Sequence, residues 1–472
     1  MRGRFQQFIA VFTATLSAVS DGMQYAWTAP IIPMIQRSNS TLQVTHTDVL
    51  WLENIYMIGG LAGIPFTILT IDRFGRKTSI LIGAVQNLVA WILIGFASSI
   101  EYIYVARFLS GLAGDVGFVA APMYVAEIAD KKIRGFLGSW IYLKMLVGVV
   151  IIYSVAPFVS IPVSSAVGCS FLIIELFTFP FMPESPYFYI MKNNPAAARK
   201  SLQRLRSTDD VQEEMEEIAI TVKMQQTKKI RYTDLVMKEN SRKALLIMTV
   251  LNLAQHFSGY SVILMNVHSI LDDAGAGTSL NSNNTAILYS ILMLVAALLA
   301  SGLVDKAGRK ILLGASSVTT GLAILILAIY LALKNYGTNV EPYNWIPIFS
   351  VMAFAICFKF GLGIVPIVTT GELFPTNLKA LGMTSADGIY IISSILSIYI
   401  YQVLKENYGI HVPFFLFAVC CFFTAIFTVF FIPETKGKTL KEIQLMLNGN
   451  KVPNNVSDVE KKLNDPENFS TL

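Results

Sequence analysis

Charged residues are scarce in this sequence of 472 residues: Asp, Glu, Lys and Arg make up 14% of it, while hydrophobic residues make up 54%. A water-soluble globular protein has about 25% charged residues. Apolar runs of about 20 residues, the length that crosses the hydrocarbon core of a bilayer as a helix, recur along the whole chain. The composition therefore excludes a soluble globular protein and predicts an all-α integral membrane protein.

Cysteine is also scarce, and the residue patterns of an active site are missing. The four cysteines all fall inside apolar runs, without the spacing of a metal site. No nucleophile triad, metal-ligand cluster or phosphate-binding loop is found in the sequence. We therefore expect no enzymatic activity, no cofactor and no metal. The net charge of +5 follows the loops between apolar runs, so it does not indicate a nucleic-acid partner.

The apolar runs predict twelve transmembrane helices. They cover residues 8–30, 50–70, 79–99, 102–124, 136–158, 162–182, 244–266, 285–304, 311–333, 345–370, 380–403 and 411–432. The first run is too long for the core of a signal peptide, and no small-residue cleavage site follows it. We therefore expect it to remain as the first span.

A polar stretch divides the chain into two sets of six spans. Residues 195–205 and 209–225 within it alternate apolar and charged residues at helical spacing, which predicts short amphipathic helices. The predicted domains are an N-terminal six-helix bundle (1–182), a cytoplasmic linker (183–243), a C-terminal six-helix bundle (244–435) and a cytoplasmic tail (436–472) with a disordered end.

The distribution of basic residues predicts the orientation in the membrane. Only Arg37, Lys334 and Lys405 lie in the loops on the side opposite the termini. The positive-inside rule then places both termini in the cytoplasm. Two glycosylation sequons, which begin at Asn39 and Asn283, fall in loops assigned to the outside. They predict a glycoprotein modified at these two residues.

A charged hexapeptide is repeated at the spacing of half the chain. Asp72-Arg73-Phe74-Gly75-Arg76-Lys77 joins spans 2 and 3, and Asp305-Lys306-Ala307-Gly308-Arg309-Lys310 joins spans 8 and 9. Two further signals return in the same order: Glu127 with Arg134 after span 4 and Glu372 with Lys379 after span 10, then Glu184 after span 6 and Glu434 after span 12. These pairs predict two six-helix repeats, the layout of transporters that bind their substrate at the repeat interface.

These motifs resemble those of the sugar porter family of the major facilitator superfamily over nearly the whole chain. Besides the hexapeptides, the matching segments are Arg107–Gly111, Pro122–Glu127, Arg134-Gly135, Pro183–Pro186, Gln255–Gly259, Gly371–Pro375 and Pro433–Gly437. Residues Trp27–Pro30 and Gly138-Ser139 look most similar to insect facilitated trehalose and glucose transporters.

The resemblance implies the major facilitator fold, and transport of a neutral sugar by facilitated diffusion through alternating access. Trehalose or a hexose such as glucose is the implied substrate. The implied setting is the plasma membrane, with membrane lipid around a protein that works as a monomer.

We interpret the charged repeats as cytoplasmic latches of the outward-facing state. One latch joins Asp72, Arg73 and Arg76 to Glu127, Arg134 and Glu184, and the other joins Asp305 and Arg309 to Glu372, Lys379 and Glu434. Each partly exposed ion pair stabilises by about 1 kcal/mol or less, which suits a contact that opens in every cycle. The alternative is that these charges only fix the topology.

The cavity residues that the resemblance implies depart from the family pattern. Gln255 is retained, but His256 replaces a second Gln and Ser261 replaces an Asn. In place of an acid, span 10 has Lys359, and Ile367 takes the place of a stacking Trp. The expected substrate-binding residues are Gln255, His256, Ser261, Tyr142, Tyr390 and Gln24. Because most of them are altered, the sequence supports transport better than any particular sugar.

Proton coupling remains an alternative. In proton-coupled sugar porters the equivalent of Arg107 pairs with an acid whose position is occupied here by Gln24. Asp21 lies three residues earlier, on about the same helix face, so Asp21 with Arg107 forms a possible proton site. Lys144 and Asp387, both in mid-span, either pair across the two halves or face an anionic ligand.

Two alternatives to a facilitator of neutral sugars stay open. One is a proton-coupled symporter of sugar or of another small polar solute. The other is a non-transporting nutrient sensor on the same fold, which long cytoplasmic extensions would favour. The predicted tail is short.

Overall fold

Helices are the regular elements of this computed structural model over its described residues, which are 2–36, 44–130, 133–227, 235, 237, 239–275, 281–374, 378–436, 438 and 440–447. The prediction of an all-α membrane protein is confirmed. Ten helical segments in these ranges are long and apolar enough to cross a membrane. Two more predicted spans, the first and the seventh, are each divided into shorter helices.

The helices fall into two groups, which we call the N-terminal half and the C-terminal half. The N-terminal half contains α1 (Arg2–Ala14), α2 (Ser17–Tyr25), α3 (Thr28–Ile35), α4 (His46–Phe74), α5 (Arg76–Gly95), α6 (Ile100–Ile128), α7 (Arg134–Val155) and α8 (Ile161–Thr178). The C-terminal half contains α13 (Glu239–Phe257), α14 (Tyr260–Ala274), α15 (Ser282–Ala307), α16 (Arg309–Asn335), α17 (Trp345–Phe360), α18 (Val365–Leu373), α19 (Lys379–Tyr408) and α20 (His411–Phe431).

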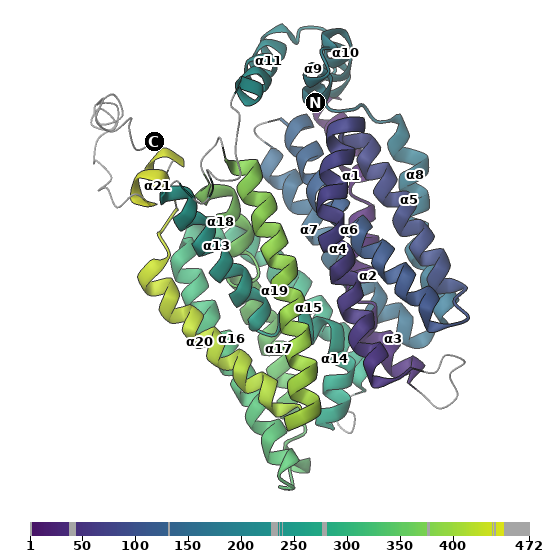
Figure 1. Cartoon of the computed structure of the whole chain (residues 1–472), viewed down its shortest axis with the longest axis vertical. Helices are drawn as coiled ribbons and strands as arrows, with labels where there is room; N and C mark the ends of the chain where they lie inside the picture. The colour runs from purple at the N-terminus through teal and green to yellow at the C-terminus, as the bar shows by residue number, and fades with distance from the viewer. Residues whose placement is uncertain are drawn as a thin grey trace.

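Short helices lie at one end of this bundle. They are α9 (Pro186–Met191), α10 (Pro195–Arg206) and α11 (Gln212–Thr227) between the halves, and α21 (Leu440–Leu447) after α20. Figure 1 shows all four at the end of the molecule where α1 begins. Asn194 caps α10 by accepting from the amide of Ala197 over 3.1 Å. Leu202 and Leu205 on the apolar face of α10 are buried.

The first span is three helices, so the prediction of one continuous helix over 8–30 is wrong in this detail. Thr13 and Thr15 turn their hydroxyls back to the carbonyls of the preceding turn at the end of α1, a contact that bends helices. Between α2 and α3, Pro30 has no amide hydrogen to donate to Ala26. The polar residues of α2 can therefore be presented at angles that a straight helix does not allow.

Packing within the N-terminal half relies on close approach of helix backbones. A Cβ added to Gly111 on α6 would lie 1.9 Å from the carbonyl oxygen of Tyr56 on α4. A Cβ added to Gly148 on α7 would lie 2.0 Å from the carbonyl oxygen of Val19 on α2. Small residues at these positions let van der Waals contact replace the hydrophobic effect, which is weak between helices in lipid.

The two halves lie side by side and meet through three main helix pairs (Figure 1). α4 packs on α19, α7 packs on α15, and α3 packs on α14. The interface that holds the predicted binding residues is therefore built by helices from both halves.

Candidate functional site

The break in the seventh span places polar groups at the interface between the halves. Gly259, with φ +83°, separates α13 from α14, and this left-handed conformation favours glycine. His256 precedes the break and Ser261 follows it, and the ring Nδ1 of His256 lies 2.8 Å from the hydroxyl of Ser261. The distortion thus brings two of the predicted binding residues into contact.

The hydroxyl of Ser261 joins three helices. It lies 2.9 Å from the Tyr25 hydroxyl on α2 and accepts from Ser394 on α19 over 3.1 Å. Tyr390, also on α19, packs its ring edge against the ring of His256 with centroids 4.2 Å apart. The Nε2 atom of His256 is buried and receives no partner within the described residues. We call Tyr25, His256, Ser261, Tyr390 and Ser394 the hydroxyl cluster.

Two glutamines predicted for the cavity lie outside the hydroxyl cluster. Gln255 donates to the carbonyl of Gly363 across 3.5 Å, at the break between α17 and α18. Gln24 is fully buried, and its Nε2 atom has no partner among the described groups. Both amides therefore keep hydrogen-bonding capacity that a polyol could use.

Tyr142 makes a different contact between the halves. Lys359, buried on α17, donates to the hydroxyl of Tyr142 on α7 over 2.5 Å. Its ammonium also lies 4.4 Å from the centre of the Tyr260 ring and 5.3 Å from that of Phe358. Such aromatic faces stabilise a cation when water is excluded.

The structure thus brings His256, Ser261 and Tyr390 together, and it places Tyr142 beside Lys359. Sequence reasoning missed the contributions of Tyr25 and Ser394. For Tyr25, the only signal in the sequence is its position next to Gln24. For Ser394 there is no signal, because the serines of α19 resemble ordinary packing residues. Ile367 is 51% exposed, in place of the stacking aromatic of the family.

Asp21 and Arg107 are not brought together. Arg107 donates to the carbonyl of Leu52 over 3.2 Å and to the backbone carbonyl of Gln24, and its guanidinium lies over the Tyr56 ring. Asp21 instead accepts from Asn87 on α5 over 2.7 Å. The predicted ion pair is absent from this arrangement.

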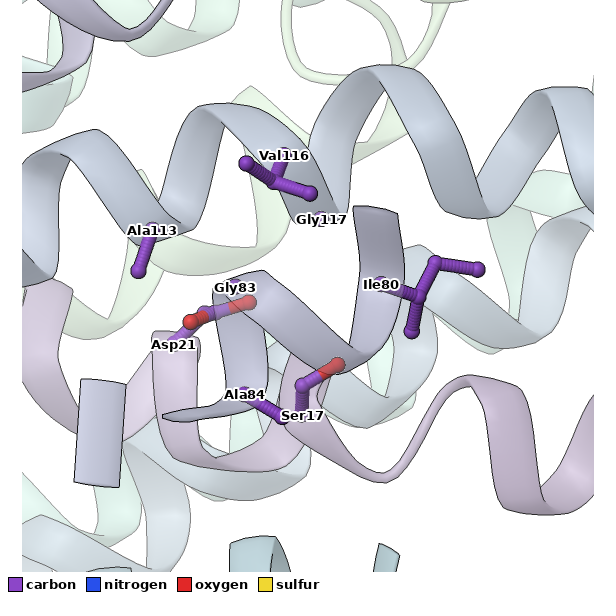
Figure 2. A pocket seen from close by; sticks show the side chains of 8 residues that line it. All are labelled: Ser17, Asp21, Ile80, Gly83, Ala84, Ala113, Val116 and Gly117. Atoms are coloured by element: carbon purple, nitrogen blue, oxygen red, sulfur yellow. The ribbon is translucent and has the colours of Figure 1, made fainter. Parts of the chain in front are cut away.

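Asp21 lines a small cavity inside the N-terminal half. Figure 2 shows its carboxylate facing the space between α2, α5 and α6, with Ser17, Gly83 and Gly117 around it. The cavity volume of about 10 Å³ suits a single water molecule. It is too small for a sugar ring, so the substrate site is expected at the interface between the halves.

Lys144 and Asp387 do not pair across the halves. Lys144 donates to the carbonyl of Phe12 over 2.7 Å and to the hydroxyl of Thr15 over 2.8 Å, both within the N-terminal half. Asp387 lies against another carboxyl group, that of Asp115 on α6.

The first charged repeat forms a compact cluster between α5, α6 and α9. Arg76 donates to Glu127 from Nη2 over 2.8 Å and from Nε over 3.1 Å. Ser185, just before α9, donates to the same carboxylate. Glu184 accepts from the backbone amide of Lys77 over 3.0 Å and so caps α5. Gly75, with φ +94°, makes the turn that exposes this amide.

The second charged repeat builds the same cluster in the C-terminal half. Arg309 donates to Glu372 from Nη2 over 2.8 Å, and Thr435 donates to that carboxylate over 2.6 Å. Glu434 accepts from the amides of Arg309 and Lys310 over 3.0 and 3.1 Å and caps α16. Each cluster joins helices of one half to the segment that follows the last helix of that half.

Several predicted latch residues lie outside these contacts. Asp72 and Arg73 are exposed, and Arg73 packs over the ring of Phe74. Arg134 donates to the carbonyl of Ala129 over 3.3 Å. The side chains of Asp305 and Lys379 are outside the part of the chain that the structure describes.

Of the two predicted glycosylation residues, the structure describes only Asn283. Asn283 lies in the first turn of α15, where its amide donates to Asn281 over 3.0 Å. Asn39 is outside the described residues, as is the end of the tail that was predicted to be disordered.

The capping carboxylates of the two clusters differ in their electrostatics. Burial raises the pKa of Glu184, although two backbone amides that donate to it oppose the rise. Burial acts in the same direction on the less buried Glu434, but three amide donors outweigh it and leave the pKa of Glu434 below its usual value. The same motif therefore holds its carboxylate more firmly charged in the C-terminal half.

Known proteins of two kinds are similar to this chain. A facilitated trehalose transporter of Polypedilum vanderplanki is 29% identical over 94% of this chain and 88% of its own length. One of Bombyx mori is 28% identical over 96% of this chain and 89% of its own length. Among solved structures, the inward-open xylose transporter XylE of E. coli is 18% identical, with a TM-score of 0.76 over 93% of this chain and 99% of that chain.

The likeness to XylE shows the fold, which is that of the major facilitator superfamily. The family described as "Sugar (and other) transporter" matches residues 3–447, which is nearly all of the sequence. With its repeated clusters and its polar interface between two helical halves, this chain belongs to the sugar transporter family.

Proposed function

We propose that this protein carries a neutral sugar, trehalose or a hexose such as glucose, across the plasma membrane by facilitated diffusion. The observation that carries the proposal is the hydroxyl cluster at the interface between the halves. Hydroxyls and a neutral imidazole both donate and accept hydrogen bonds, as the hydroxyl groups of a sugar do. The two insect relatives are named as trehalose transporters, which supports this class.

The proposed mechanism is alternating access by two bundles, residues 1–182 and 244–435, which move relative to each other around the cluster. In the predicted linker (183–243) and tail (436–472), helices α9–α11 and α21 lie at one end of the molecule (Figure 1), which we assign to the cytoplasm from the basic residues gathered there. Breaking the contacts of Ser261 with Tyr25 would let the halves separate on one side. The sugar is released unchanged, without a cofactor, and a single chain suffices.

The two charged clusters have a supporting role in this mechanism. Arg76 with Glu127 and Arg309 with Glu372 fasten the cytoplasmic ends of helices within one half. A half that moves as a rigid body needs such internal contacts. Asn39 and Asn283 would carry glycans on the opposite side.

Lys359 supports a second candidate, a small anionic solute. Its ammonium is buried between the halves, and within the described residues no carboxylate forms an ion pair with it. A buried cation gains from an anionic partner. A sugar acid therefore belongs in any substrate panel.

Uptake of labelled trehalose, glucose and a sugar acid into proteoliposomes that contain the purified chain tests the proposal. We expect trehalose or glucose to equilibrate without accumulating, with or without a proton gradient. A Gln255→Ala variant serves as a control for specific binding and should slow uptake. Uptake of the sugar acid alone would favour the second candidate, and no uptake of any sugar by correctly inserted protein would overturn the assignment.

A further inference from the structure

We propose that Asp115 and Asp387 share one proton across the interface between the two halves, and that loss of this proton separates the halves on the cytoplasmic side. Asp115 lies on α6 in the N-terminal half and Asp387 on α19 in the C-terminal half. The pair is thus a proton-binding site that neither half can form alone.

The two carboxyl groups are in hydrogen-bond contact. Asp115 is 4% exposed, and its Oδ2 atom accepts from the hydroxyl of Thr67 on α4 over 2.5 Å. Its other oxygen, Oδ1, is buried and receives no hydrogen bond from a donor group within the described residues. The same holds for Oδ2 of Asp387. Each carboxyl group therefore has one buried oxygen that lacks a donor.

The chemistry of carboxyl groups supplies the missing donor. Ionised carboxylates only accept hydrogen bonds, so two of them in contact repel each other at low dielectric. A single proton turns one group into a donor, and the pair then titrates as a unit. The contact is stable only while that proton is present.

Among the described residues, the surroundings offer no basic group that could replace the proton. On the helices packed against α6, Asp21 of α2 faces Gly117, and the Tyr56 hydroxyl of α4 faces Gly114. On α19 itself, Tyr390 is the titratable neighbour of Asp387. The described side chains of α5, α7, α13, α18 and α20 place no Lys or Arg against the pair. The facing titratable groups that the structure describes are thus acidic or phenolic.

The position of the pair determines which side of the interface separates when the proton is lost. The hydrogen bonds between the halves include Thr28 to the carbonyl of Met265, Tyr153 to the carbonyl of Leu264, and Gln402 to Glu53. Two of these contacts are made by α14, which pairs with α3, and Figure 1 shows α3 and α14 toward the end of the molecule opposite α9–α11 and α21. Asp115 and Asp387 lie farther toward α9–α11 along their helices. Repulsion between them would therefore open the cytoplasmic side while the opposite contacts hold.

Only one part of this inference rests on the proposed function, namely that the conformational equilibrium of the protein depends on pH. The proton itself can be measured without any sugar. Purified full-length protein in lipid vesicles, with cysteines replaced except for spin labels at Thr78→Cys and Ile311→Cys, reports the distance between the halves. Both labelled positions are exposed and begin equivalent helices, α5 and α16.

We expect the label distance to lengthen when the pH is raised, and to become independent of pH in Asp115→Asn and in Asp387→Asn. Infrared spectra should show a protonated carboxyl band that either substitution removes. Asp21→Asn is the matched control, since Asp21 is a buried Asp of the same half that does not contact Asp387, and the pH-dependent distance change should persist. Two separate variants keep the test decisive if one fails to fold.

Three results would overturn the inference. They are a wild-type distance that does not respond to pH, a response that survives in both Asn variants, and a response that sodium produces at constant pH. Failure of sugar uptake together with an intact pH response would instead contradict only the proposed function.

Discussion

Lys359 and Tyr142 join the two halves through a hydrogen bond of 2.5 Å between an ammonium and a phenol. Lys359 is 1% exposed, so water cannot take the place of the Tyr142 hydroxyl as its hydrogen-bond acceptor in this arrangement. Removal of the Tyr142 hydroxyl and removal of the Lys359 ammonium should therefore differ in their effect on stability.

Tyr142→Phe should destabilise the protein more than Lys359→Met. The first change leaves a buried ammonium without its hydroxyl acceptor, which costs about 1–3 kcal/mol. The second removes the buried charge and keeps an apolar chain of similar volume, which is often neutral or stabilising. Thermal unfolding in lipid should therefore give the lowest Tm for Tyr142→Phe.

The double variant Lys359→Met with Tyr142→Phe provides the control. It should recover most of the Tm lost in Tyr142→Phe, because the unpaired ammonium is gone. Additive losses in the double variant would show that the contact does not carry this energy.

The second prediction compares the two charged clusters. In the N-terminal pair the side chains of Arg76 and Glu127 are 5% and 14% exposed, while those of Arg309 and Glu372 are 9% and 24% exposed. Glu127→Gln should cost roughly 3 kcal/mol, since it leaves a buried guanidinium unpaired.

Glu372→Gln should cost less, because water can reach the more exposed pair. Thermal unfolding of the two variants in the same lipid measures the difference. Equal losses would mean that burial does not set the strength of these pairs.

The third prediction concerns acid. The pKa of Glu434 lies below its usual value, so its capping of α16 contributes stability at neutral pH that is lost as the pH falls through that depressed pKa. The stability difference between wild type and Glu434→Gln should therefore be largest near neutral pH and shrink on acidification.

Glu184→Gln should show the opposite slope. Burial raises the pKa of Glu184, so the native protein binds the proton more tightly than the unfolded chain does. Wild type should lose stability relative to Glu184→Gln as the pH rises from the usual glutamate pKa through the raised one. Melting curves across this pH range test both variants, and parallel curves for the two would refute the assigned difference.

The sequence predicts the order of the helices well because the hydrophobic period and the repeated motifs are local signals. The partners of Arg76 and Arg309 follow from the repeat, since each motif returns at an equivalent position. Contacts between the halves have no such signal. Whether Asp387 meets Lys144 or Asp115 depends on how two bundles dock, and no spacing within one helix encodes that.

Asp21 shows how a local rule fails. Its spacing from Gln24 correctly places both on α2, but Asp21 faces Asn87 and Gly117. Gly117 lies ten residues beyond Arg107 on α6, or about 15 Å along the helix axis. Sharing a helix face with Gln24 therefore did not bring Asp21 to Arg107.

The last prediction tests the hydroxyl cluster through transport. Ser261→Ala removes the hydroxyl that contacts Tyr25, Ser394 and His256. A neutral hydrogen bond contributes about 1 kcal/mol, which corresponds to about a fivefold change in an equilibrium constant. Sugar uptake by Ser261→Ala should therefore show a KM raised about fivefold.

Tyr25→Phe should raise the KM to a similar extent, and the double variant should add little, because both changes remove the same contact. Ser393→Ala is the matched control: Ser393 is a buried serine of α19 whose hydroxyl donates to the carbonyl of Ile389 within its own helix over 2.7 Å. Its KM should stay at the wild-type value. If Ser393→Ala and Ser261→Ala raise the KM equally, the effect arises from helix packing, and the cluster does not bind the sugar.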